Sequence, residues 1–167
     1  ELYAPDKYTL PIPPSPNLPN MKAVYLYPAT CYFEATPVSL GRGTSLPFQV
    51  YGHPNMTGYD YSFTPKSVPG AKNPPQLNKL CHGVNLSNMS DEEIWKRGVD
   101  LSYVIDAYKN LNIGDHFFRP FFELLVGTDY VRKMIIEGKS AEEIKNRWKG
   151  DVEKFKEQRK PYLLYQE

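Results

Sequence analysis

The sequence has few cysteines, no excess of charge of either sign and no long apolar run. Its 167 residues include two Cys, 20 Lys and Arg and 19 Asp and Glu, for a formal net charge of +1. Two Cys do not make a disulfide-rich scaffold. The charge balance argues against a nucleic-acid binder that relies on a strong basic field. Since no apolar run approaches the roughly 18 residues of a transmembrane helix, the sequence predicts no membrane span.

Proline and charge are distributed unevenly along the chain. Of the 16 Pro, 14 lie in residues 1–75, whereas only ten Asp, Glu, Lys and Arg lie in residues 1–90 against 29 in residues 91–167. The first half is therefore typical of short strands and ordered loops punctuated by Pro, and the second of amphipathic helices. We predict an α+β fold, with a small sheet or barrel-like body first and three or more helices after it.

Residues 1–20 are rich in Pro, five of which lie between residues 11 and 19. These prolines exclude a helix and hold the backbone extended, and interleaved aromatic and aliphatic residues argue against disorder. We therefore expect an ordered Pro-rich loop. The segment lacks an initiator Met, a basic region and an apolar region, so it is neither a signal peptide nor an obvious natural start. We expect the chain to be a fragment of a longer protein.

The first half predicts one helix and four short strands. Residues 20–27 are expected to form a helix, with Asn20 as its N-cap and Pro28 at its end. Strands are expected where short apolar runs are bounded by Gly, Pro or Asn. The four strand candidates are Cys31–Ala35, Phe48–Tyr51, Tyr61–Thr64 and Leu80–Leu86.

Capping signals predict helices after residue 90. Ser90 followed by Glu93, and Ser140 followed by Glu143, both have the spacing of a capping box. Thr128 is expected to cap a further helix between them.

Apolar residues at helical spacing indicate which faces of these helices point inward. They are Leu101, Val104, Ile105 and Tyr108, then Val131, Met134 and Ile135, and finally Ile144, Trp148, Val152 and Phe155. Pro161 is expected to stop the last helix. The apolar tail Tyr162–Tyr165 is expected to pack on the body of the protein.

The densest group of polar residues lies between Cys31 and Thr44. Glu34 is the one charged residue of an expected strand, and Arg42 lies between two glycines. Flanking glycines let the backbone bend sharply and approach a ligand, and the guanidinium fork suits a carboxylate. The loop is therefore a candidate contact for an anion or a sugar acid. Alternatively, it is a tight turn in which Arg42 pairs with Glu34 for structural reasons alone.

A complete catalytic or metal site within the chain is not indicated. A glycosidase usually needs two carboxyl groups at a set separation, and Asp60, the nearest other acid to Glu34, lies in a stretch typical of a turn. The three His and two Cys lack CxxC or HExxH spacing, so we predict no metal site. There is also no P-loop and no nucleophile elbow, and we predict no cofactor.

Two further features each allow two interpretations. Cys31 and Cys81 lie on candidate strands, where they either form a disulfide or remain buried thiols. The first half is also rich in Tyr. These rings either stack on sugars or belong to a half-buried sheet.

Several motifs, in this order, resemble the C-terminal part of the exo-β-N-acetylmuramidase (NamZ) family. They are Pro14–Pro19, Tyr27–Glu34, Ser39–Thr44, Pro47–Phe48, Gly52–Pro54, Leu80–Val84 and Lys160–Tyr165. The similarity runs over essentially the whole chain, and the ordered set is specific. The chain departs from the family pattern at Ala35, Pro37, Leu40 and His82. An acidic residue is common at the position of Leu40, and its absence here weakens the argument that this loop brings a second carboxylate.

The resemblance implies the C-terminal half of a bacterial cell-wall hydrolase. Family members remove N-acetylmuramic acid from the non-reducing ends of peptidoglycan fragments. They resemble two-domain proteins whose Rossmann-like N-terminal domain carries the catalytic Glu. Residues 1–167 would then be a single domain that completes the substrate cleft and is inactive alone. Its partners would be the missing N-terminal domain and peptidoglycan fragments or muramic acid glycosides, in a periplasmic or secreted location.

The resemblance and the residue chemistry meet at Arg42. N-acetylmuramic acid carries a lactyl carboxylate, which Arg42 would hold. Glu34 would orient Arg42 or a sugar hydroxyl, and it is the best local candidate for a catalytic residue. Asn17 would cap the Pro-rich loop or donate to the N-acetyl group, and Thr44 would face the same cleft. The alternative is a non-catalytic module that binds glycan or a partner protein, with Glu34 and Arg42 as a structural pair.

Overall fold

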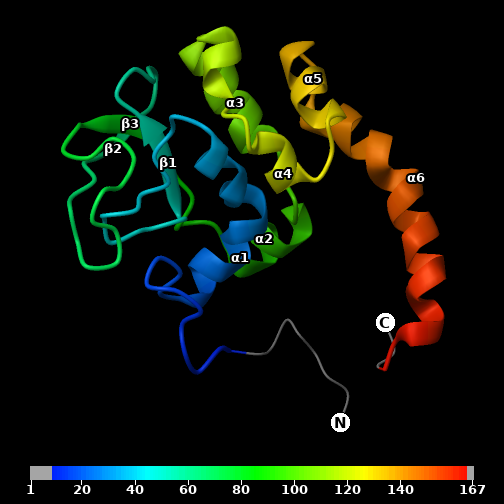
Figure 1. Cartoon of the computed structure of the whole chain (residues 1–167). Helices are drawn as coiled ribbons and strands as arrows, with labels where there is room; N and C mark the ends of the chain where they lie inside the picture. The colour runs from blue at the N-terminus through cyan, green and yellow to red at the C-terminus, as the bar shows by residue number, and fades with distance from the viewer. Residues whose placement is uncertain (1–8, 165–167) are drawn as a thin grey trace.

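The computed structural model describes residues 9–164, which form an α+β fold with a small sheet to one side of a helical body (Figure 1). This confirms the fold class. Part of the expected Pro-rich loop, residues 1–8, lies outside the described residues. Within the remainder of that loop, the N–H of Leu18 donates to the carbonyl of Ser15 at 2.9 Å and closes a turn.

The sheet has three antiparallel strands in the order β1–β3–β2, formed by β1 (Val50–His53), β2 (Tyr61–Phe63) and β3 (Cys81–Asn85). Three of the expected strands are thus confirmed, each within two residues of its expected bounds. Gly83 of β3 pairs with Gly52 of β1 and with Tyr61 of β2. A Cβ atom at Gly83 would lie 1.9 Å from the carbonyl oxygen of Tyr51. Only glycine therefore lets these strands approach so closely.

The first helix, α1 (Met21–Thr30), is longer than expected. Asn20 is its N-cap, as predicted, and accepts the N–H of Ala23 at 2.9 Å. Pro28 lies inside the helix rather than at its end. A proline in a helix interior costs about 3 kcal/mol. Here burial of Leu26 and Ala29 on the inner face offsets that cost, since they are only 1% and 4% exposed.

The expected strand at Cys31–Ala35 is wrong, because this segment is the 3₁₀ helix η2. It follows α1 directly and continues the same buried face. Phe33 is 1% exposed and stacks on Tyr51 with 4.8 Å between ring centroids. Core packing of the aromatic ring thus decides the conformation of a segment whose composition favours a strand.

The second half, as far as residue 164, forms five helices with short connections. They are α2 (Asp91–Arg97), α3 (Ser102–Leu111), α4 (Phe122–Val126), α5 (Tyr130–Ile136) and α6 (Ala141–Arg159), with 3₁₀ turns η3 (Gly114–Phe117) and η4 (Lys160–Tyr162). None of the described helices is both long and apolar enough to cross a membrane.

The caps of these helices follow the predictions in part. Ser140 and Glu143 form the full capping box of α6. Ser90 accepts the N–H of Glu93 at 3.2 Å, although the Glu93 carboxylate accepts from an arginine instead of completing the box. The prediction that Thr128 caps α5 is wrong. The helix has no side-chain cap, and the buried Thr128 hydroxyl has no partner among the described residues.

One hydrophobic core joins both halves of the chain. Leu101, Val104 and Ile105 are buried, as expected from their spacing. Next to them, the rings of Phe117, Phe118 and Phe122 pack edge to face at 5.0 and 4.6 Å between successive centroids. This aromatic cluster anchors the segment that leads into α4.

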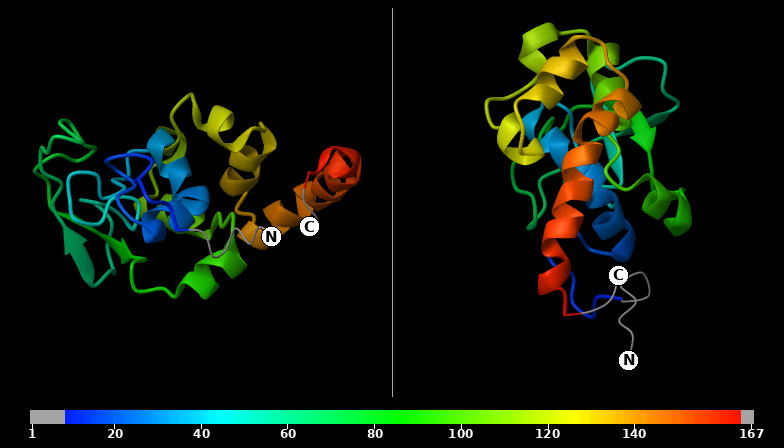
Figure 2. Two further views of the ribbon diagram at one scale, coloured as in Figure 1. Left: turned by 90° about the horizontal axis from the view of Figure 1, so that it is seen from below. Right: turned by 90° about the vertical axis from the view of Figure 1, so that its right-hand side faces the viewer.

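The helix α6 leaves this core after its first turns and projects from the body (Figures 1 and 2). Ile144 is buried, but Val152 and Phe155 are 42% and 60% exposed, which contradicts the expected inward face. The tail as far as residue 164 is also exposed rather than packed, with Tyr162 at 82%. Its last residue, Tyr165, lies outside the described residues. The helix has 19 residues and is about 28 Å long, so its second half extends beyond the core against which its first turns pack.

Replacement of glycine by alanine should have opposite effects on stability at two positions, one where β1 and β3 pair closely and one on an open helix surface. Gly83→Ala should lower the free energy of unfolding by about 2 kcal/mol or more, because its methyl group meets backbone atoms. Gly150→Ala in α6 is the matched control. Among the described residues outside its own helix turn, nothing lies within 4 Å of the position that its methyl group would take, so this change should raise the free energy of unfolding by about 0.5–1 kcal/mol. Urea denaturation measures both free energies of unfolding. Equal stability of the two variants would contradict the close approach of β1 and β3 at Gly83.

Candidate functional site

An open cavity of about 360 Å³ lies where η2, the loop after it and the segment before α4 meet. Its walls combine apolar side chains with three charged groups and one amide. The lining residues are Phe33, Glu34, Val38, Leu40, Arg42, Asn73, Pro75, Arg119 and Phe121. The volume is at the lower end of the range for small-molecule sites.

The loop that carries Arg42 is held to the edge of the sheet. Ser39 and Gly52 exchange two backbone hydrogen bonds at 2.8 and 3.0 Å. Gly41 and Gly43 have φ angles of 71° and 81°, which favour glycine. A Cβ atom at Gly43 would lie 2.2 Å from the carbonyl oxygen of Lys66. Gly43 therefore lets the loop approach the backbone at Lys66. The sequence instead predicted that the flanking glycines let the loop approach a ligand.

Glu34 and Arg42 form an ion pair at the cavity wall. The distance from Nη2 of Arg42 to Oε1 of Glu34 is 2.5 Å, and the Arg42 and Glu34 side chains are 35% and 24% exposed. The Arg42 guanidinium also lies over the ring of Phe48, 5.3 Å from its centre. A pair this exposed contributes about 1 kcal/mol or less to stability. The position of the pair on the cavity wall therefore says more about a role in ligand binding than its small contribution to stability does.

Phe48, which supports Arg42, has an unusual backbone conformation. Its φ angle is 60°, although the residue is bulky and only 2% exposed. Positive φ at such a residue costs of order 1 kcal/mol or more and persists only where the surroundings enforce it. Such strain clusters at functional sites.

Asn17 and Thr44, both predicted to face the same cleft, do not line this cavity. The Asn17 amide donates to the carbonyl of Gly70 at 2.9 Å and ties the Pro-rich loop to the connection between β2 and β3. The Thr44 hydroxyl donates to the carbonyl of Gly41 at 2.6 Å and closes the loop of Arg42. Both residues thus support the walls, and their contact with a substrate stays a prediction.

Arg119 and Phe121 are cavity residues that sequence reasoning missed. They come from the half of the chain in which the sequence indicates no chemistry. The N–H of Arg119 donates to the carbonyl of Ala35 at 2.8 Å, which places it beside η2. Phe121 is 39% exposed. One local signal was present, because Arg119 is the single charged residue in a run with four Phe, and a guanidinium there must reach water or a partner.

None of the tyrosines that the structure describes in the first half lines the cavity. Tyr51 is buried, and its hydroxyl donates to Asp106 at 2.9 Å. The hydroxyl of Tyr59 donates to the same carboxylate oxygen at 2.7 Å. Burial and the Asp106 carboxylate together raise the pKa of both hydroxyls. These two rings therefore favour the structural interpretation of the tyrosine excess.

Cys31 and Cys81 are free thiols, with Cys81 buried and Cys31 half-buried, so the structure favours thiols over a disulfide. Burial raises the pKa of both thiols to about 11, and at Cys31 the Glu34 carboxylate adds to this effect. Such thiols are poor nucleophiles at neutral pH. Within residues 9–164, no group of three or more His, Cys, Asp and Glu side chains is arranged to hold a metal ion.

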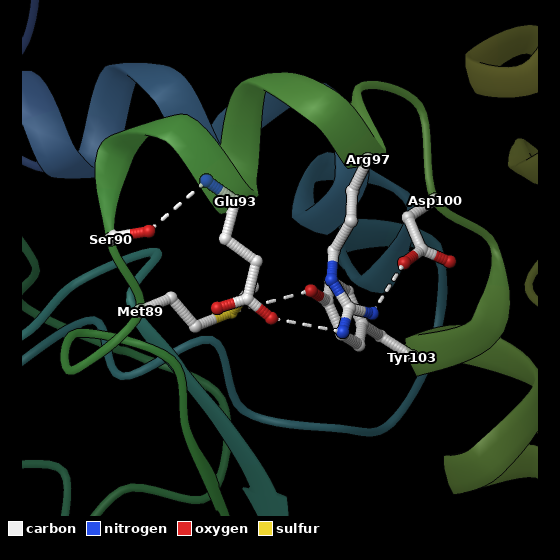
Figure 3. A network of polar contacts seen from close by, with 6 residues as sticks. All are labelled: Met89, Ser90, Glu93, Arg97, Asp100 and Tyr103. Carbon is white, nitrogen blue, oxygen red and sulfur yellow. Dashed lines mark hydrogen bonds and ion pairs between the residues drawn. The ribbon is translucent and has the colours of Figure 1, made fainter.

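Arg97, by comparison with Arg42, has a guanidinium that donates hydrogen bonds to two carboxylates (Figure 3). It donates to Asp100 at 3.2 Å and to Glu93 at 3.1 Å, and these hydrogen bonds raise its pKa. The group closes the end of α2 and lies outside the cavity lining. In contrast, Arg42 has one carboxylate partner, and its buried Nε has none among the described residues.

Three comparisons relate this chain to known proteins. A family model described as exo-β-N-acetylmuramidase NamZ, C-terminal, matches residues 25–165. The chain is 34% identical over 167 residues to the peptidoglycan β-N-acetylmuramidase NamZ of Bacillus subtilis (strain 168), in a match that covers 91% of the chain and 40% of that protein.

Two crystal structures of DUF1343 family proteins from Bacteroides fragilis NCTC 9343 also match. One is 82% identical with a TM-score of 0.94, over 96% of this chain and 45% of that one. The other, at 20% identity and a TM-score of 0.65 over 93% of this chain, shares the fold alone. The chain spans less than half the length of the first relatives it matches.

Alkylation should distinguish buried thiols from reactive ones. At pH 8, a pKa of about 11 in place of 9.0 lowers the thiolate fraction about 100-fold. Cys31 and Cys81 should therefore react with iodoacetamide at least about 100-fold more slowly in the native protein than in urea. Peptide mass spectrometry over time measures each site. Native rates equal to those in urea would contradict the described burial.

Proposed function

This chain belongs to the NamZ family of exo-β-N-acetylmuramidases, as the C-terminal part, and we propose that it completes the substrate cleft of a peptidoglycan-processing enzyme. The observation that carries the proposal is the Glu34–Arg42 pair on the wall of an open cavity. The pair is partly exposed and weakly stabilising. Its position on the cavity wall makes both side chains available to a ligand.

The chemistry of the cavity suits N-acetylmuramic acid. This sugar carries a lactyl group whose carboxylate is ionised at neutral pH. A guanidinium recognises a carboxylate through two parallel hydrogen bonds, which gives orientation as well as affinity. The cavity has two arginines and one glutamate, a positive excess of one charge. Its volume fits one sugar ring better than a long glycan.

In this proposal, Arg42 contacts the lactyl carboxylate and Glu34 orients Arg42 or accepts a sugar hydroxyl. Glu34 is the one carboxylate among the described lining residues. Hydrolysis of a glycosidic bond usually uses two carboxyl groups. We therefore propose that the catalytic acid comes from the upstream half of the longer protein and that the isolated chain is inactive. Since the substrate is cell wall, the location would be periplasmic or secreted.

A second candidate function is a non-catalytic module that binds glycan or a protein. The observation in its favour is that Arg42 already has a carboxylate partner at 2.5 Å, as a purely structural pair would. The two functions differ in what loss of Arg42 does. A cleft residue affects hydrolysis, and a structural pair affects stability alone.

Replacement of Arg42 should reduce catalysis in the longer enzyme. With the upstream half present, Arg42→Ala should lower kcat/KM on a chromogenic N-acetylmuramic acid glycoside by about tenfold or more, equivalent to about 1.4 kcal/mol of transition-state stabilisation. Arg97→Ala is the matched control, because Arg97 is also paired with carboxylates but lies outside the cavity. It should leave kcat/KM within about twofold.

Unchanged kinetics in a folded Arg42→Ala protein would remove this assignment and favour the module. Hydrolysis by the isolated chain of 19.2 kDa would also contradict the proposal, since the catalytic groups would then lie within these residues.

A further inference from the structure

We propose that Arg119 makes the principal ion pair with the substrate carboxylate, with Arg42 and Glu34 forming the neighbouring polar wall. This rests on the proposed function and names the residue that selects for an acidic sugar. Sequence reasoning assigned no role to Arg119, and the cavity places it beside the Glu34–Arg42 pair.

Arg119 has no side-chain partner among the described residues. It is exposed and forms no ion pair or side-chain hydrogen bond within residues 9–164. Another arginine of the aromatic region, Arg132, is engaged, since it donates to Glu123 at 3.2 Å and lies over the ring of Phe118. A guanidinium that lines a cavity without a carboxylate partner is available to an anionic ligand.

Arg42 is less available than Arg119. Its Nη2 already donates to Glu34, so a ligand carboxylate that approached this side would also meet the Glu34 charge. Like charges a few ångströms apart repel, more strongly where solvent is partly excluded. The carboxylate is therefore favoured towards the Arg119 side of the cavity, where Arg119 is its principal partner and Arg42 a second donor. Glu34 is then left to accept a sugar hydroxyl.

The backbone of Arg119 is held firmly enough to position a charge. Its N–H donates to the carbonyl of Ala35, and its own carbonyl accepts from the N–H of Phe122 at 3.0 Å. The nearby Phe118 and Phe122 are 6% and 0% exposed. Because the backbone is already fixed by core packing, ligand binding has to order only the side chain, which costs about 0.5–1.5 kcal/mol.

Two further lining residues complete a subsite for a substituted sugar. Phe121 follows Arg119 by two positions and presents a partly exposed ring, which can pack against the apolar face of a pyranose. Asn73 contributes an amide from the connection between β2 and β3, which can donate to or accept from the N-acetyl group.

Product inhibition in the longer enzyme tests this assignment. Arg119→Gln should raise KM for the chromogenic N-acetylmuramic acid glycoside by about tenfold or more, with kcat within about threefold. It should weaken inhibition by free N-acetylmuramic acid to a similar extent, and leave inhibition by N-acetylglucosamine, which lacks the lactyl carboxylate, unchanged. Arg119→Lys should recover part of the loss because it keeps the charge. Arg132→Gln, outside the cavity, is the matched control.

The outcomes separate this inference from the proposed function. If Arg119→Gln behaves like the parent while Arg42→Ala is impaired, the assignment of Arg119 is wrong and the cleft function stands. If neither change has an effect, both fail. Equal weakening of the two inhibitors would also overturn the inference, since Arg119 would then act on the shape of the cavity rather than on the carboxylate.

A different observation, the uncovered face of α6, carries a second inference. Trp148, Val152 and Phe155 follow one side of this helix, and Val152 and Phe155 are 42% and 60% exposed. They border an open, mostly apolar hollow of about 400 Å³ beside Tyr130. Thr128 also borders the hollow. Apolar residues gathered on one helix face are typical of a surface that is covered by another body.

We infer that the upstream half of the same polypeptide covers this face in the longer proteins. The matched region is only 40% of the Bacillus subtilis relative and 45% of the Bacteroides fragilis structure, so more than half of each protein lies outside it. In Figure 1 and in the right-hand view of Figure 2, the first described residues lie at the same end of the molecule as the far end of α6, and the left-hand view of Figure 2 shows the two apart across that end. A domain that precedes this chain would therefore be attached at this end of the molecule.

Site-specific labelling tests this interface without reference to activity. In the protein with its upstream half, Phe155→Cys should react with a maleimide about tenfold or more slowly than Glu157→Cys, which lies two positions further along α6 on another side. In the isolated chain, both should react at similar rates. Mass spectrometry separates these sites from Cys31 and Cys81.

Equal rates at the two sites in the longer protein would overturn the inference. So would protection of Phe155→Cys that is present in the isolated chain and grows with concentration, since the cover would then be a second copy.

Discussion

The short 3₁₀ helix η2 is the element on which the candidate site depends. Phe33 stacks on Tyr51 and binds η2 to the sheet, and the carbonyl of Ala35 accepts the N–H of Arg119 and binds η2 to the segment before α4. Glu34 lies between these two anchors and pairs with Arg42. The loop of Arg42, the strand β1 and the segment before α4 therefore all meet around the five residues of η2. If that helix were the strand that its composition favours, alternate side chains would point to opposite faces, and this wall would not form.

The charge balance of the cavity follows from this arrangement. Two guanidinium groups and one carboxylate leave a positive excess of one charge, which a ligand with its own carboxylate would neutralise. Partial exposure keeps the repulsion between the two arginines small, because water and salt screen it. Two parts of the cavity wall are held rigidly by the rest of the fold. The glycine loop is fixed to the sheet, and the phenylalanine cluster fixes the backbone around Arg119. The site thus combines a rigid frame with a charge that the fold alone leaves unbalanced.

In both proposals, the upstream half of the longer protein covers a surface that this chain leaves open: the cavity in one and the uncovered face of α6 in the other. The hydrophobic core includes residues of α1 and η2 and, from α6, residues of its first turns only. Beyond that point, apolar side chains meet solvent, which is costly for a helix that stands alone. A chain that spans less than half the length of its relatives is expected to have such surfaces. The proposed cleft and the proposed interface are then two parts of one contact with the upstream half.

Local patterns determined much of this protein. The caps at Asn20 and Ser140, the positions of the three strands and the Glu34–Arg42 pairing depend on residues within about ten positions of one another, so sequence alone could predict them. The α+β class followed from the uneven distribution of Pro and charge between the two halves. The family was also visible in the order of short motifs. Only the tertiary structure decided that Pro28 stays inside a helix, that Arg119 joins the cavity and that Phe155 remains uncovered. These outcomes depend on burial against segments far away along the chain, whose packing energy outweighs the local preferences of about 1–3 kcal/mol that a sequence pattern reports.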